Sequence, residues 1–270
     1  MVQMTDKEFL EFVKYMNANY GIDLSKKKVL IEGRLSNIIE KKGMSSFGQY
    51  LESVKNNSKE EITMLVNKLT TNYTYFYREE SHFEYLKETI LPNEEKNNKT
   101  KILNIWSAGC SSGEEPYTIA MILDDYFKYS IDRWKININA TDISENVLKK
   151  AREGIYSEDS IKRLPEHFKK KYLIRLNDNK YQVTTEIKKH INFKVFNLMS
   201  PIIEKNKYHF VFLRNVMIYF DPETKINIVN KLYDAIWPGG YLLIGHAETI
   251  QRNNSNFQYI KPAVYKKEYV

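Results

Sequence analysis

The first candidate for ligand chemistry is a small-residue loop in the stretch LNIWSAGCSSGEEPYTIA, residues 103–120. An apolar run ends at Gly109, a second glycine follows at Gly113, and a helical pattern then begins with Glu114 and Glu115. A strand, a glycine loop and a helix form the nucleotide-binding turn of many proteins, where backbone N–H groups and the helix dipole face a phosphate. Two glutamates at the helix start would repel a phosphate, so the stretch indicates a ligand of another charge.

The loop also has a purely structural interpretation. Its sequence, G-C-S-S-G-E-E, matches neither the G-x-G-x-x-G pattern of dinucleotide enzymes nor the G-K-[ST] ending of P-loop proteins. Pro116 suits the first turn of a helix, and glutamates in that turn favour the helix dipole. From the loop alone, ligand binding and helix capping both remain open for the two glutamates.

Asp142 favours ligand binding, because it ends the next apolar run, within NATDIS at residues 139–144. At the carboxyl end of the second strand of such a sheet, an acid can accept hydrogen bonds from both ribose hydroxyls. The alternative is that Asp142 caps the next helix, a role for which Ser144 competes. An acid-rich pocket without a phosphate-binding lysine suits S-adenosylmethionine (SAM), which carries a ribose, a sulfonium and an α-amino group.

The elements that must position these residues follow two patterns. The first 70 residues contain amphipathic segments of helical period and no strand alternation, which predicts a small all-α domain. From Thr100, apolar β-rich runs alternate with helical stretches, which predicts an α/β domain with a doubly wound, Rossmann-like parallel sheet. We expect a helical domain at 1–70, a linker at 71–99 and the α/β domain at 100–270, with a small antiparallel β insertion at about 172–190.

Composition limits the class of protein further. The chain has 270 residues, of which 42% are hydrophobic and 28% charged, as in ordinary globular proteins. No apolar run approaches the roughly 20 residues of a membrane span, the first residues lack the pattern of a signal peptide, and the single cysteine fits a reducing compartment. These features predict a cytoplasmic location. The net charge of +7 permits an acidic protein partner or nucleic acid.

Six stretches, taken together and in order, resemble the CheR family of chemotaxis receptor methyltransferases. They are NYTYFYRE (72–79), IWSAGCSSGEEPYTIAM (105–121), ATDISENVLKKAREGIY (140–156), FNLMSP (196–201), LRNVMIYFD (213–221) and GGYLLIGHAE (239–248). The resemblance implies a SAM-dependent methyltransferase that converts glutamate side chains in the cytoplasmic helical bundle of chemoreceptors to γ-methyl esters, with S-adenosylhomocysteine as the second product. It also implies no nucleic-acid partner and no insertion into the membrane.

The resemblance assigns roles to residues that match the family motifs. The cofactor-binding residues it implies are Asn72, Thr74, Arg78, Glu114 with Glu115 as its less certain neighbour, Asp142 for the ribose, Asn197, Leu198, Arg214 and Asn215. Arg78 and Tyr219 are the residues it places nearest to methyl transfer. Some relatives dock on a C-terminal receptor pentapeptide through a longer, glycine-containing loop. The segment RLNDNKYQV (175–183) is short and lacks glycine, so we expect no dependence on that peptide.

The chemistry of the expected reaction needs little beyond positioning. A glutamate with a pKa of about 4.3 is already a nucleophilic carboxylate at neutral pH, so no general base is required. No metal is expected, because the histidines show no ligand spacing and one cysteine cannot form a zinc site. Arg78 can orient a carboxylate by paired hydrogen bonds, although an ion pair with Glu79, Glu80 or Glu84 is the alternative. Tyr219 can position substrate or be a half-buried core residue.

Three further interpretations remain. Lys26, Lys27, Lys28 and Arg34 begin a helical segment and either face an acidic receptor helix or form a solvated surface. The basic charge permits a methyltransferase acting on RNA or on a small molecule, although no NPPY-type motif and no RNA-binding module is recognisable. A catalytically silent protein that senses SAM or S-adenosylhomocysteine is the third alternative.

Overall fold

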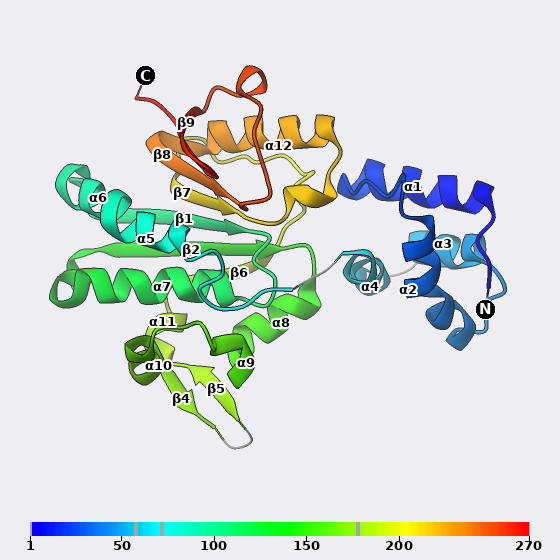
Figure 1. Ribbon diagram of the computed structural model, residues 1–270, viewed down its shortest axis with the longest axis horizontal. Helices are drawn as coiled ribbons and strands as arrows, with labels where there is room; N and C mark the ends of the chain where they lie inside the picture. Colours follow the sequence, from blue (N-terminus) through cyan, green and yellow to red (C-terminus); the bar gives the residue numbers. More distant parts are fainter. Residues whose placement is uncertain (1, 57–58, 71–72, 177–178, 270) are drawn as a thin grey trace.

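The computed structural model describes residues 2–56, 59–70, 73–176 and 179–269. The first of its two domains consists of α1 (Asp6–Tyr20), α2 (Lys28–Lys41), α3 (Phe47–Asn56) and α4 (Lys59–Leu69). Thr5 accepts a hydrogen bond from the Glu8 N–H and the Glu8 side chain bonds the Thr5 N–H, so the capping box is complete. The predicted all-α domain is confirmed, and Figure 1 shows it as a separate bundle beside the sheet.

A short helical segment connects this domain to the sheet. It comprises α5 (Ser81–Tyr85), the π-helical turn η1 (Leu86–Ile90) and α6 (Leu91–Asn97). Phe83, Leu86 and Ile90 are buried in the core of the second domain. The segment therefore packs as part of the α/β domain.

The second domain is built on a seven-stranded sheet of order β6-β2-β1-β7-β8-β10-β9. The first five in that order are parallel: β6 (Ile191–Val195), β2 (Lys135–Asp142), β1 (Ile102–Ala108), β7 (Tyr208–Leu213) and β8 (Ile236–Ile244). The hairpin of β9 (Gln258–Lys261) and β10 (Val264–Lys266) adds to one edge in antiparallel pairing. The predicted doubly wound sheet is confirmed, whereas this hairpin was not predicted.

Both faces of the sheet are covered by helices (Figure 1). One face packs on α7 (Glu114–Phe127), α5 and α6, and the other packs on α12 (Pro222–Ala235). Ile105 and Phe210 belong to the first core, while the next residues along each strand, Trp106 and Val211, belong to the second. This alternation follows the two-residue period of a strand. α8 (Glu145–Glu153), α11 (Thr185–Lys188) and the 3₁₀ turns η2 (Lys128–Arg133) and η4 (Arg252–Asn254) complete the connections.

The apolar run 208–220 is a strand only as far as Leu213. Asn215 has a φ of 58°, which ends the extended conformation, and Met217–Tyr219 form the 3₁₀ turn η3. The run therefore bends at the carboxyl edge of the sheet, which is the edge where ligands bind in this class of fold.

A small antiparallel sheet lies apart from the main one and has the order β3-β5-β4. The predicted hairpin corresponds to β4 (Leu173–Arg175) and β5 (Lys180–Val183), and β3 (Ile155–Ser157) adds a third strand from earlier in the chain. α9 (Glu158–Ile161) and α10 (Glu166–Tyr172) connect these strands. The insertion thus begins before the expected residue 172.

The two domains are joined by hydrogen bonds near the end of α1. The Asp23 N–H donates to the Tyr219 carbonyl at 2.8 Å, and Asn17 Nδ2 donates to Asp221 Oδ2 at 2.8 Å. Gly21 lies between them with a φ of 66°, and a Cβ there would stand 2.6 Å from a Thr224 methyl and 2.8 Å from the Met199 sulfur. Among the described residues, no helix is long and apolar enough to cross a lipid bilayer.

Substituting Gly21→Ala should loosen the contact between the domains. Both Gly21 and Gly43 end helices with left-handed backbone, but a Cβ at Gly43 would meet nothing within 4 Å. Gly43→Ala should cost about 1–2 kcal/mol of unfolding free energy from backbone strain. Gly21→Ala should cost about 1–3 kcal/mol more, because of the added clash across the interface. If urea titrations gave equal losses of unfolding free energy for the two variants, the proposed clash at the domain interface would be contradicted.

Candidate functional site

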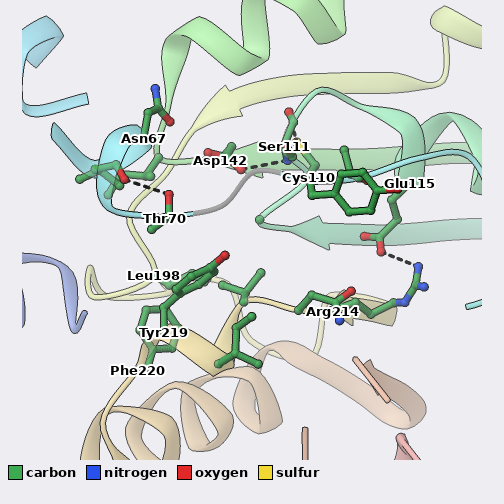
Figure 2. Close-up of a pocket in the computed structure, with 18 of the residues that line it drawn as sticks. Asn67, Thr70, Cys110, Ser111, Glu115, Asp142, Leu198, Arg214, Tyr219 and Phe220 are labelled. Carbon is green, nitrogen blue, oxygen red and sulfur yellow. Dashed lines mark hydrogen bonds and ion pairs between the residues drawn. The ribbon is translucent and has the colours of Figure 1, made fainter. Parts of the chain in front are cut away.

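A pocket of about 340 Å³ lies between the two domains, at the carboxyl ends of β1, β2 and β7. Its walls come from the end of α4, the segment 73–78, the glycine loop 109–111 and the segments 196–198 and 214–220. Figure 2 shows Asn67 and Thr70 of the helical domain on the left, Asp142 and Ser111 toward the middle, Glu115 on the opposite side near Arg214, and Tyr219 below. Both domains therefore contribute side chains to a single cavity.

The glycine loop approaches its neighbours too closely for a side chain. Gly109 has a φ of 81°, its N–H donates to the Thr141 carbonyl at 2.7 Å, and a Cβ would stand 2.4 Å from a methyl group of Val216. Ser111 also has left-handed backbone, with a φ of 49°. Such conformations are costly outside glycine and gather at binding sites, where the surrounding structure maintains them.

Asp142 is held at the pocket wall by two backbone N–H groups. Ser111 donates to its Oδ2 at 2.9 Å and Ser144 donates to its Oδ1 at 3.0 Å. Ser144 caps α8 by accepting from the Val147 N–H, so Asp142 does not serve as that cap. Burial raises the pKa of Asp142, while the N–H donors act to lower it. Its remaining lone pairs can accept hydroxyl groups of a ligand in the pocket.

The two glutamates that begin α7 have separate surroundings. Glu115 lines the pocket, accepts from Ser107 Oγ at 2.7 Å and pairs with Arg214 Nη1 at 2.9 Å. Glu114 is buried and accepts from Ser112 Oγ at 2.8 Å and Ser160 Oγ at 3.3 Å, and burial raises its pKa. Glu114 does not line the pocket, because successive residues of a helix point about 100° apart.

Arg214 joins three segments of chain beneath the pocket. Its side chain is 2% exposed and bonds Glu79 Oε2 at 3.2 Å, the Glu115 carboxylate and the Arg78 carbonyl. Its guanidinium also lies 5.1 Å from the centre of the Phe83 ring. Burial acts to raise the pKa of Glu79, but the charge of Arg214 and the hydrogen bond from Asn215 outweigh it and lower that pKa. A buried charge pair of this kind requires such additional hydrogen bonds.

Arg78 does not form the ion pair with a neighbouring glutamate that was the alternative interpretation of its role. Its Nη1 donates to the Tyr73 carbonyl at 2.6 Å, and within the described part of the chain no carboxylate forms an ion pair with it. Glu79 pairs with Arg214 instead. Since a guanidinium has five N–H donors, Arg78 retains donors for a ligand in the pocket that it lines.

The remaining predicted residues also gather at this cavity. Thr74, Asn197, Leu198, Asn215 and Tyr219 line it. Asn197 Nδ2 donates to the Asn19 carbonyl at 2.8 Å, and Asn215 Nδ2 donates to Glu79 Oε1 at 3.1 Å, so both amides also support the walls. Asn72 lies outside the described residues.

Sequence reasoning missed the wall contributed by the helical domain. Asn67, Thr70, Tyr20 and Ile22 line the pocket, and Asn67 Nδ2 bonds Ser144 Oγ at 2.7 Å. None of them lies in a recognised motif, although Asn67 and Thr70 lie within the five residues before NYTYFYRE. The pairing of Glu79 with Arg214 was also missed, since the adjacent Arg78 was the more obvious partner.

Glu79, His82 and His246 could in principle hold a metal, because their ligand atoms lie within 4.8 Å of one another. The oxygens of Glu79 already accept from Arg214, Asn215 and the His246 N–H. Burial and the charge of Arg214 lower the pKa of His82 to about 3, so its ring is neutral. The same charge would repel a cation here. That the reaction uses no metal stays a prediction.

Two family models cover almost the whole chain. Residues 7–70 match the "CheR methyltransferase, all-alpha domain", and residues 72–266 match the "CheR methyltransferase, SAM binding domain". The chain is 47% identical to a chemotaxis protein methyltransferase of Borreliella burgdorferi, over 98% of this chain and 96% of that protein. It is 34% identical to chemotaxis protein methyltransferase 2 of Vibrio cholerae, over 95% of this chain and 90% of that protein. A solved structure of a SAM-dependent methyltransferase from Methanosarcina mazei is similar at 18% identity and a TM-score of 0.33, over 58% of this chain and 56% of that chain.

The different surroundings of the two glutamates predict different effects on SAM binding. Glu115→Gln should raise the Kd for SAM about tenfold, because it removes one negative charge from the pocket wall. Glu114→Gln is the matched change one residue away and should alter that Kd less than about twofold. Calorimetric titration of both variants measures this, with thermal unfolding as the check on folding. A larger effect at Glu114 would contradict the placement of Glu115 as the ligand-facing residue.

Proposed function

Because the chain belongs to the CheR methyltransferase family, we propose that it transfers the methyl group of SAM to glutamate side chains of chemotaxis receptors. The products are glutamate γ-methyl esters and S-adenosylhomocysteine. The acceptor glutamates lie in the cytoplasmic helical bundle of the receptors. This specific reaction is our proposal, and the observation that carries it is the set of side chains lining the pocket between the domains, which includes Asp142, Glu115 and Arg78.

The pocket combines acidic and basic side chains with polar groups suited to a ribose. Glu115 and Asp142 line the cavity together with Arg78 and Arg214, and Glu79, which does not line it, pairs with Arg214. No lysine is among the described residues that line the cavity. SAM carries a sulfonium, an ammonium and a carboxylate, so its positive groups suit the two acids and its carboxylate suits an arginine. Asp142 supports the ribose, and Glu115 the positively charged end of the ligand.

The residues of the chain then have separate tasks in the reaction. SAM supplies, when bound, an electrophilic methyl group on a sulfonium. Arg78 orients the acceptor carboxylate, which is already ionised at neutral pH and needs no base. Apolar lining residues exclude water from the reacting groups, namely Phe196, Leu198, Val216 and Phe220. Tyr219 lines the same cavity and can position the acceptor through its hydroxyl.

The basic residues at the start of α2 support receptor docking only in part. Arg34 Nη1 donates to the Lys68 carbonyl at 2.9 Å and to the Thr70 carbonyl at 3.1 Å, so it braces the pocket wall. Lys28 pairs with Asp6 at 2.6 Å. Lys26 and Lys27 are therefore the better candidates for contact with an acidic receptor helix. Docking through a receptor pentapeptide is not part of our proposal, because the β4–β5 hairpin is short.

The labelled-methyl assay tests the proposal directly. Methyl-labelled SAM and receptor signalling-domain fragments should yield protein label that mild base releases as methanol, because a glutamate methyl ester is base-labile. A denatured enzyme sample is the control for non-enzymatic transfer. Label in RNA, or base-stable label, would replace the proposal with another methyltransferase activity. SAM binding without any transfer would indicate a sensing protein.

Arg78→Ala should reduce methyl transfer at least about 100-fold, because the acceptor carboxylate loses the group that orients it. The domain interface and the Arg214 ion pairs do not involve the Arg78 side chain, so thermal unfolding should change little. Arg78→Lys keeps the charge but not the paired donors and should restore only part of the rate. Near-normal turnover of Arg78→Ala would refute the assigned role.

A further inference from the structure

A further cation, Arg163, lies beside the rim of the pocket and contacts an aromatic side chain there. Arg163 Nη1 donates to the Tyr75 hydroxyl at 3.2 Å, and the guanidinium carbon lies 4.8 Å from the centre of the Tyr75 ring. Tyr75 and Tyr73 both line the pocket, with their ring centres 5.6 Å apart. Tyr73 is also 69% exposed, so this part of the lining is where the cavity meets solvent.

The two arginines contact different members of this pair of tyrosines. Arg78 donates to the Tyr73 carbonyl, while Arg163 reaches Tyr75 from the segment between α9 and α10. We call Arg78, Tyr73, Tyr75 and Arg163 the rim row. The two segments of the row are fixed side by side, because the Phe76 N–H donates to the Ser160 carbonyl at 3.1 Å.

Arg163 is well placed to bind an external anion. Its neighbours Ile161 and Leu164 are each 2% exposed and anchor the backbone, while Arg163 itself is exposed. Among the described residues, its side chain makes one hydrogen bond, to Tyr75, and no ion pair. A guanidinium has five N–H donors in a planar fork suited to carboxylates, and stacking on an aromatic ring restricts its orientation. The contact with Tyr75 therefore positions the charge and leaves most donors available.

We propose that Arg163 is a specificity-determining residue that binds a second acidic side chain of the acceptor helix while Arg78 orients the carboxylate to be methylated. This inference rests on the proposed protein-methylating function. On a helix, side chains three, four or seven residues apart share one face. The preferred acceptor therefore carries an Asp or Glu at one of these distances from the methylated glutamate. Glutamates without such a neighbour are poorer substrates.

Steady-state methylation of receptor signalling-domain fragments tests the proposal. Arg163→Ala should raise the KM for the fragment roughly fivefold, because one oriented charge contact is lost. The kcat and the KM for SAM should stay within about twofold of wild type, because Arg163 does not line the cofactor cavity. Lys162→Ala removes an exposed charge one residue away and should change the fragment KM less than about twofold.

A charge exchange adds a readout that a merely structural role would not produce. Arg163→Glu should methylate the native fragment poorly, and replacing the second acidic residue of the fragment by lysine should restore its KM to within about threefold of the wild-type pair. Lack of rescue at every position three, four or seven residues away would overturn the proposal, as would an unchanged KM for Arg163→Ala. If the wild-type protein methylates no receptor fragment, the proposed function itself fails and the inference falls with it.

Discussion

The buried ion pairs of Arg214 are the interaction on which the site depends. The Arg214 guanidinium, which follows β7, connects Glu79, just before α5, with Glu115 of α7. Removing two or three charges from water costs several kcal/mol per ion, which only close pairing and additional hydrogen bonds can offset. The chain supplies these from Asn215, Ser107 and the Arg78 carbonyl. Three segments distant in sequence must therefore assemble together, or a charge is left buried without a partner.

The same requirement explains the unusual backbone around the site. Tyr77, Glu79 and Asn215 all have a φ near 60°, a conformation that costs of order 1–3 kcal/mol outside glycine. At Glu79 and Asn215 this turn directs the two side chains toward each other, and the Glu79 carboxylate toward Arg214. The backbone strain is confined to these single residues, whereas the Arg214 ion pairs that maintain it join segments distant in sequence. The Arg78 backbone is fixed in the same way, because its carbonyl accepts a hydrogen bond from Arg214 and the next residue, Glu79, pairs with Arg214.

The sequence predicted what depends on local period and on local motifs. The two-domain organisation and the parallel strands follow from hydrophobic spacing along the sequence. Most of the predicted site residues line one cavity because they lie at the carboxyl ends of strands. The roles of Glu114 and Glu115 were not separable, since that required knowing which side of α7 faces the glycine loop. Asn67 and Tyr20 were missed because their place in the wall depends on how two domains dock.

The shared pocket has a thermodynamic consequence for the whole molecule. Tyr20, Ile22, Asn67 and Thr70 belong to one domain, and Asp142 and Tyr219 belong to the other, so a molecule in the cavity contacts both. Any ligand that binds only the docked arrangement stabilises docking by the same free energy with which docking favours the ligand. Occupancy and domain association are therefore one coupled equilibrium. Without a ligand, the docked arrangement depends on the contacts between the domains themselves, such as the Asp23–Tyr219 and Asn17–Asp221 hydrogen bonds.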